Sequence, residues 1–152
     1  MQKLLTAIIL FALVPFLGCN GGPKSAKGFS LPDGEVQKGR ATFVEMQCHA
    51  CHKVAGLDQL ATAEGQPELS IKLGGEVSRI KTYGELVTSI INPSHRMAKG
   101  YSAEYVQDDG VSKMPVYNDA MTVAQLTDLV AFLQSKYTLR EYEPTVYVPY
   151  GY

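Results

Sequence analysis

The sequence predicts an all-α fold with three or more helices joined by long loops. Two segments open with a capping box, a threonine followed three residues later by Glu or Gln, and each continues as an apolar stripe with helical spacing. Before residue 138 there is no alternation of apolar and polar residues of the kind that marks strands. Glycine and proline interrupt the long segments 53–81 and 94–121. Loops of that length are unusual in a compact domain unless they pack against something other than helices.

The first predicted helix begins at Asp33, whose carboxylate can cap a helix by accepting hydrogen bonds from backbone N–H groups. Val36, Gly39 and Phe43 then recur at a spacing that places small or apolar residues on one face. We expect this helix to lead directly to Cys48.

The two later helices begin at the capping boxes. Thr82 and Glu85 form the first box, and a proline two residues beyond its apolar stripe marks the end of that helix. Thr122 and Gln125 form the second box, and we expect its helix to continue to Tyr137. The apolar stripes consist of Leu86, Ile90 and Ile91 in the first helix and Leu126, Leu129, Val130 and Leu133 in the second.

Residues 1–18 have the features of an export signal. Lys3 is followed by an uncharged apolar stretch that is too short, and too abruptly followed by polar residues and glycine, for a membrane-spanning helix. The run Phe16, Leu17, Gly18, Cys19 resembles a bacterial lipobox, although leucine is usual at the first of these positions. We therefore expect a lipoprotein-type signal peptide over 1–18 and lipidation of Cys19. An ordinary secretory signal and an uncleaved anchor helix are the alternatives.

The rest of the 152-residue chain is expected to divide into three parts. Residues 19–32, rich in Gly, Ser, Lys and Pro, read as a flexible tether, and residues 33–137 as one folded domain. Residues 138–152 form a tail rich in Tyr and Pro, which either docks a partner or packs back on its own domain. Loss of residues 1–18 removes only Lys3, leaving 13 basic against 15 acidic residues, and this balance does not favour nucleic acid as a partner.

Cys48, Cys51 and His52 form a C-x-x-C-H motif. This is the spacing at which two thiols can add to the vinyl groups of haem while the histidine binds its iron. On a helical turn, positions i, i+3 and i+4 share a face, so the three side chains would point the same way. We predict one covalently attached haem c with His52 as an iron ligand. With Cys19 assigned to lipid, no cysteine remains for a disulfide.

Other uses of the cysteine pair fit less well. A zinc site needs a second pair of ligands at suitable spacing, which neither His95 nor Cys19 supplies. A thioredoxin-like redox pair needs a strand and a helix within a parallel sheet, which the pattern does not contain. His49 lies inside the motif and would point to another side of the turn, so we expect it to be exposed.

The iron needs a sixth ligand or keeps an open site. The candidates downstream of the motif are His95, Met97, Met114 and Met121. A loop methionine most often fills a gap in the core. Met114, however, lies in a loop and is followed by Pro115, which restricts the backbone where a ligand must be held. We therefore predict that His52 and Met114 are the two metal ligands.

These elements, in this order, resemble the class I c-type cytochromes over about residues 33–137. The matching features are the Gly39 and Phe43 pair, the C-x-x-C-H motif, Pro67, the Met114–Pro115 loop and the last helix, Leu126 to Lys136. The resemblance implies a cytochrome c fold, with long loops wrapped around the haem and the Gly/aromatic pair crossing the last helix. It also implies that the backbone carbonyl of Pro67 accepts the imidazole N–H of His52. The departures are the long loop from the motif to Pro67 and the C-terminal tail.

With both axial positions filled, the iron has no site for a substrate. We expect a single-electron carrier rather than an enzyme, with no small-molecule substrate. Lipid at Cys19 would hold it on a bacterial membrane, facing the periplasm or exterior. Its partners would be redox proteins of a respiratory chain: a terminal oxidase, a reductase or a dehydrogenase.

Two other functions remain open. Residues 89–101 resemble a segment of cytochromes that serve respiratory oxidases and of haem subunits in periplasmic dehydrogenases, so the chain could be a subunit of such a complex. A haem sensor or small peroxidase would require an open sixth position. Three lysines lie near the motif or the methionine loop in sequence: Lys53, Lys99 and Lys113. They either surround an exposed haem edge for an acidic partner or are ordinary solvated residues.

Overall fold

A computed structural model of the chain describes residues 29–54, 56–57 and 69–142. The expected signal peptide, Cys19, Pro67 and residues 143–152 of the tail lie outside these ranges. The chain separates into two compact units, 1–31 and 32–152, and the second contains all the helices and strands described below. None of the helices within the described ranges is long and apolar enough to cross a membrane.

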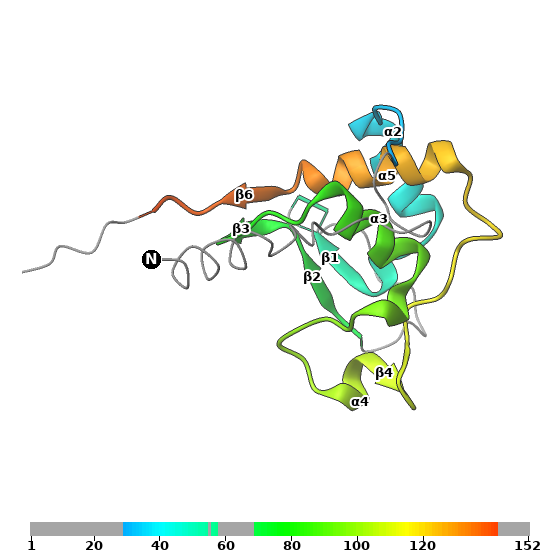
Figure 1. The fold of residues 1–152 in the computed structure, drawn as a ribbon, viewed down its shortest axis with the longest axis vertical. Coiled ribbons are helices and arrows are strands. Elements are labelled where there is room, and N and C mark those ends of the chain that lie inside the picture. Colours follow the sequence, from blue (N-terminus) through cyan, green and yellow to red (C-terminus); the bar gives the residue numbers. More distant parts are fainter. Residues whose placement is uncertain (1–28, 55, 58–68, 143–152) are drawn as a thin grey trace, which may run out of the picture. The chain divides into compact units, whose positions relative to one another are not determined.

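Two helices, α2 (Val36–Glu45) and α5 (Val123–Gln134), cross each other and make the most extensive contact between any two elements (Figure 1). The crossing depends on Gly39, because a Cβ at this position would lie 1.9 Å from the backbone carbonyl oxygen of Asp128. One turn later Phe43 packs on Phe132, with ring centroids 5.6 Å apart. The expected crossing of the Gly39 and Phe43 pair with the last helix is confirmed.

The start of α2 differs from the prediction. The N-cap is Glu35, two residues after Asp33. Among the described residues, no N-cap side chain forms a capping hydrogen bond with the first turn of α2. Instead, the Asp128 carboxylate on α5 accepts a hydrogen bond from the backbone N–H of Glu35 at 2.7 Å. The prediction that Asp33 caps this helix is wrong, because a residue from α5 supplies the acceptor.

Both capping boxes are confirmed. In α3 (Tyr83–Ile91) the Glu85 N–H donates to Thr82 Oγ1 at 3.2 Å and the Thr82 N–H donates to Glu85 Oε2 at 2.9 Å. Thr122 and Gln125 make the equivalent pair at the start of α5, at 3.1 and 2.9 Å. Helix α3 stops before Pro93, which opens the 3₁₀ turn η2 (Pro93–His95), as expected.

Three short strand pairs, which the sequence analysis did not predict, fasten the long loops. Two are parallel, β1 (His52–Val54) with β2 (Ile71–Leu73) and β3 (Gly75–Val77) with β6 (Tyr137–Leu139), and β4 (Gln107–Asp108) pairs antiparallel with β5 (Val111–Ser112), next to the single turn α4 (Ala103–Val106). Strand β6 explains why α5 ends at Gln134 rather than continuing to Tyr137: the chain leaves the helix to pair with β3 (Figure 1). Strands of two or three residues are too short to show alternation in a sequence.

The core lies between α2, α3 and α5. Its largest fully buried side chains are Phe43, Phe132, Val54 and Val130. Leu86 and Ile90 of the predicted α3 stripe are buried, but Ile91 is 40% exposed and Val87 is buried in its place. The apolar face of α3 is therefore rotated by about one residue from the predicted stripe.

Candidate functional site

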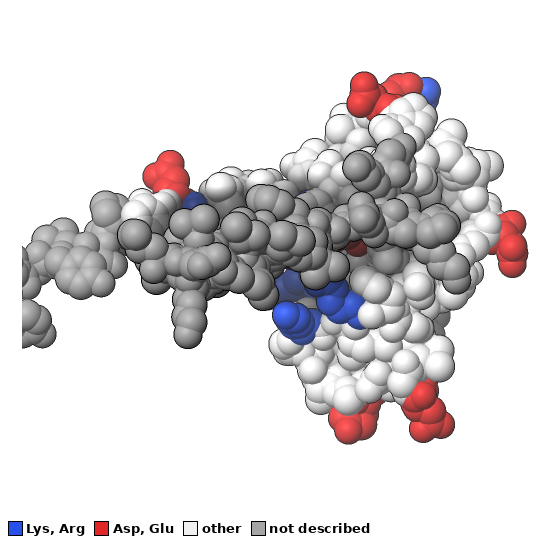
Figure 2. Space-filling view, in the orientation of Figure 1, with Lys and Arg blue, Asp and Glu red and all other residues white. Residues whose placement is uncertain are grey.

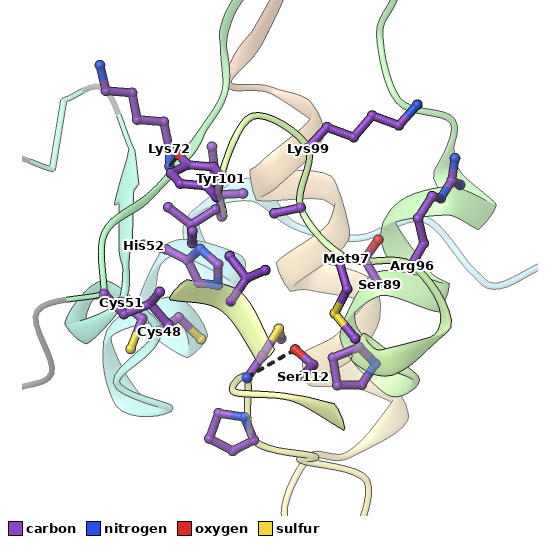
Figure 3. A pocket seen from close by; sticks show the side chains of 18 of the residues that line it. Cys48, Cys51, His52, Lys72, Ser89, Arg96, Met97, Lys99, Tyr101 and Ser112 are labelled. Atoms are coloured by element: carbon purple, nitrogen blue, oxygen red, sulfur yellow. Dashed lines mark hydrogen bonds between the residues drawn. The ribbon is translucent and has the colours of Figure 1, made fainter. Parts of the chain in front are cut away.

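The C-x-x-C-H motif directly follows α2. Gln47, with a positive φ of 54°, turns the chain out of the helix into the 3₁₀ turn η1 (Cys48–Ala50). Cys51 closes that turn, its N–H donating to the Cys48 carbonyl at 3.2 Å, and His52 is the first residue of β1. The motif is thus a tight turn followed by a strand, rather than one α-helical turn. All three side chains nevertheless line one cavity (Figure 3).

This cavity has a volume of about 590 Å³. That value falls in the range of roughly 300–1,000 Å³ that is usual for small-molecule and cofactor sites. Apolar side chains from several elements line it, among them Ile71, Leu73, Pro93, Val106 and Pro115. The loops that separate the helices supply most of this lining, so they do pack against a common space.

The two thiols lie in an environment that disfavours their ionised form. Burial raises the pKa of Cys48 to about 11 and also raises the pKa of Cys51. A reactive redox pair uses a thiolate of lowered pKa, so the raised values do not favour that use. In the part of the chain that the structure describes, no three His, Cys, Asp or Glu residues are grouped to hold a metal ion. The described surroundings of the two thiols therefore favour neither a redox pair nor a metal site built from protein ligands alone.

The His52 side chain is half-buried, and its pKa lies below the ordinary value. Burial lowers its pKa, the backbone of Ile71 acts in the opposite direction, and the Lys81 charge lowers it further. Its Nδ1 is buried and has no hydrogen-bond partner among the described residues. Buried polar nitrogens are normally paired, and neutral imidazole is the form that binds a metal. Pro67, whose carbonyl is the expected acceptor, lies outside the described residues.

His49 differs from its prediction. It is half-buried rather than exposed, and its Nδ1 is buried without a partner in the described parts of the chain. It lies in the middle of the 3₁₀ turn η1 and not on an α-helical turn as expected.

Two methionines line the same cavity as His52, namely Met114 and Met97. Met121 lines a smaller cavity of about 70 Å³ that shares Met114 and His52 with the first, and His95 lines neither. The backbone at Met114 is well anchored: its N–H donates to Ser112 Oγ at 3.1 Å, and the Ser112 N–H donates to Ser94 Oγ at 3.0 Å (Figure 3). Met114 thus lies in a loop that hydrogen bonds through Ser112 and Ser94 hold in place.

The charged residues of the cavity were largely missed by the sequence analysis. Of the three lysines it singled out, only Lys99 lines the cavity, whereas Lys113 bonds to the Glu104 carbonyl and lies 3.7 Å from Asp108. The basic residues that line it are Lys72, Arg79, Lys81, Arg96 and Lys99. Their one signal in the sequence is that all five belong to the two glycine-containing stretches on either side of α3.

The wall beside Lys72 is closed by two tyrosines. The Tyr101 hydroxyl accepts from the Lys72 N–H at 3.2 Å, and the Tyr105 hydroxyl accepts from the Ser70 N–H at 2.7 Å. The two rings stack with centroids 5.7 Å apart. Of these residues Lys72 and Tyr101 line the cavity, and Tyr105 packs behind Tyr101.

A helical domain whose loops enclose a cavity lined by C-x-x-C-H, an apolar wall and loop methionines has the features of a c-type haem protein. Residues 36–136 match the family model for cytochrome c, and the chain belongs to this family. No curated protein and no solved structure gives a significant match. Membership makes the chain a c-type cytochrome, an electron-transfer protein whose cofactor is haem c.

The residues present fit that cofactor. Within the described residues, the cavity offers two thiols, a half-buried imidazole whose buried Nδ1 has no hydrogen-bond partner, two methionine sulfur atoms and five basic side chains. The four α-helices among the described residues are consistent with the predicted cytochrome c fold. The fold prediction is confirmed at this level, and the short strand pairs add to it.

Proposed function

We propose that this chain is a single-electron carrier with one haem c, attached through Cys48 and Cys51 and ligated by His52 and Met114. The observation that carries the proposal is that all four side chains line a single cavity. Haem c supplies a one-electron ferric/ferrous couple. The protein's own residues hold the group, exclude water from it and leave no coordination site for a substrate.

Each residue has a separate role in this proposal. Cys48 and Cys51 would each hold the haem through a thioether, formed when the S–H adds across a vinyl C=C with the proton passing to the vinyl carbon. The neutral His52 imidazole donates an electron pair to the iron. Apolar side chains such as Leu73 and Val106 keep water away, which favours the reduced state and raises the reduction potential.

The choice between Met114 and Met97 rests on how their loops are held. A ligand must be preorganised, because the entropy of ordering it would otherwise weaken the bond. Ser112 fixes the Met114 backbone from one side and Pro115 restricts it from the other. Met97 lies across the cavity from His52 in Figure 3 and serves as the matched control in the experiment below.

We also propose that the protein is exported and held by lipid at Cys19 on the extracytoplasmic face of a bacterial membrane, where it exchanges electrons with respiratory redox proteins. The support is the sequence of residues 16–19 and the tether that follows. The same site would serve a haem subunit of a larger periplasmic dehydrogenase or oxidase complex. Co-purification of a second polypeptide with the full-length protein would favour that alternative.

The test is the optical spectrum of the full-length holoprotein, together with haem staining after denaturing electrophoresis. We expect covalently bound haem, and in the ferric protein the weak far-red band of Met-sulfur ligation. Met114→Ala should remove that band, while Met97→Ala should retain it. If Met114→Ala has the parent spectrum, the ligand assignment is wrong. If the reduced parent protein binds carbon monoxide readily, the open site of a sensor or peroxidase replaces the carrier.

A further inference from the structure

The cavity has two chemically different ends. In Figure 3, Cys48 and Cys51 lie together at one end, whereas the amino and guanidinium groups of Lys72, Lys99 and Arg96 lie toward the other. Figure 2 shows Lys and Arg side chains gathered on one face of the molecule, with most acidic side chains at its periphery. A haem held by thioethers at Cys48 and Cys51 would have its vinyl edge at the cysteines. Its two propionates, on the opposite edge of the macrocycle, would then face the basic end.

Within the described parts of the chain, positive charge predominates around the cavity. Five basic side chains line the cavity, against a single carboxylate, Glu85, among the described residues. Cations beside an apolar cavity attract an anion, because the low-dielectric wall strengthens the field inside. A bound group that carries two negative charges on one edge would complement this excess of positive charge.

Glu85 holds two of the cations together. Its carboxylate accepts from both terminal nitrogens of Arg79 at 2.8 Å and lies 3.4 Å from a nitrogen of Arg96. The hydrogen bonds from Arg79 and from the Thr82 backbone hold the pKa of Glu85 well below its usual range. Glu85 is therefore ionised and links the loop before α3 to the loop after η2.

Stability alone does not explain this arrangement. The side chains of Arg79 and Arg96 are 63% and 50% exposed, and ion pairs at such positions contribute little to folding. The ion pairs with Glu85 instead fix the planar guanidinium groups of Arg79 and Arg96 at the cavity. Arg96 gives one nitrogen to Glu85, and with respect to the described residues its other donors remain available for a second carboxylate.

We propose, building on the haem function above, that Arg79 and Arg96 form a clamp for the haem propionates and that Glu85 is its positioning residue. The planar fork of arginine matches a carboxylate and binds it through two parallel hydrogen bonds. Lys72, Lys81 and Lys99 add positive charge around the clamp. A cation beside a propionate stabilises the reduced haem, which has one positive charge fewer, so the clamp raises the reduction potential.

The experiment is a redox titration of the holoprotein, followed by absorbance, for the parent and Arg96→Gln. We expect the equilibrium constant for reduction to fall about three- to tenfold in Arg96→Gln, where a tenfold change corresponds to about 59 mV for a one-electron couple. Arg140→Gln is the matched control, because Arg140 also pairs with a carboxylate, that of Glu76 at 3.2 Å, but does not line the cavity. Equal potentials in Arg96→Gln and Arg140→Gln would overturn the clamp.

A double-mutant cycle tests the role of Glu85. Glu85→Gln preserves the capping box, since Gln125 makes the same two bonds with Thr122 at the start of α5. If Glu85 positions Arg96, the potential change caused by Arg96→Gln will be smaller in the Glu85→Gln background than in the parent. Additive changes would show that Arg96 acts without Glu85. Absence of covalent haem from the parent would instead contradict the proposed function itself, and haem staining of every variant separates the two failures.

Discussion

Gly39 of α2 lies directly against Asp128 of α5, since a Cβ at Gly39 would lie 1.9 Å from the Asp128 carbonyl oxygen. The Asp128 carboxylate also accepts from the backbone N–H of Glu35 at 2.7 Å. Asp128 of α5 thus contacts α2 twice, at its N-cap Glu35 and at Gly39. Because the C-x-x-C-H motif directly follows α2, this crossing determines where the motif lies.

Gly39→Ala should destabilise the domain by roughly 3 kcal/mol, because the added methyl group meets backbone atoms that cannot move aside without separating the helices. The free energy of unfolding would be measured by urea titration of the holoprotein. Gly84→Ala in α3 is the control: a Cβ there meets nothing within 4 Å, so it should be neutral or stabilising by up to about 1 kcal/mol. Similar losses in the two variants would contradict the close approach.

The double variant Cys48→Ser, Cys51→Ser should lose covalent haem completely, because serine forms no thioether with a vinyl group. Each single variant should retain one link. Haem staining after denaturing electrophoresis under reducing conditions measures this directly. His49→Gln, a change inside the motif at a side chain that does not line the cavity, should stain like the parent.

Ser112→Ala should weaken the hold on Met114, because the Met114 N–H loses its acceptor at 3.1 Å. A single hydrogen bond of this kind is worth about 1 kcal/mol. We expect the far-red band of the ferric protein to disappear at a lower temperature than in the parent. Ser102→Ala is the control, since the Ser102 side chain makes no capping bond to α4; an equal shift in both variants would mean that Ser112 has no specific role.

Glu85 should contribute to stability above about pH 4.5 and less in acid. Its pKa in the folded protein lies below the ordinary value of 4.5, chiefly through the hydrogen bonds from Arg79. A depressed folded-state pKa gives stability that is complete above the unfolded-state value and is lost as the pH falls toward the folded-state value. Because the partner arginines are exposed, the loss is small, and the thermal midpoint of Glu85→Gln should be slightly lower than that of the parent at neutral pH.

That difference should narrow as the pH is lowered through 4 toward 3. Glu76→Gln provides the comparison, because Arg140 contacts Glu76 through one nitrogen at 3.2 Å instead of two, and its effect at neutral pH should be smaller. A Glu85→Gln difference that is constant across this pH range would show that ionised Glu85 does not stabilise the fold.

Signals between residues close in sequence were sufficient to predict part of the fold. The capping boxes at Thr82 and Thr122 involve residues three apart, so local chain geometry decides them. The spacing of Cys48, Cys51 and His52 is likewise a local property, and it predicted a common direction for these side chains even though the turn is 3₁₀ and not α-helical.

Contacts between distant residues decided the rest. Asp33 does not cap α2 because Asp128, 93 residues after Glu35, supplies the acceptor. Helix α5 stops at Gln134 because the chain beyond it pairs with β3, which lies about 60 residues earlier.

By itself the sequence determined the helices that carry their own caps, the glycine and aromatic pair on α2, and the motif that predicts haem. Only the tertiary structure decided which of the other side chains surround the cavity. Met97 and the basic residues Lys72, Arg79 and Arg96 carry no local signal for this, because they come from loops whose paths depend on strand pairs and tyrosine contacts formed across the fold. A capping bond joins residues within one turn, whereas a cavity wall depends on how loops from separate parts of the chain are brought together.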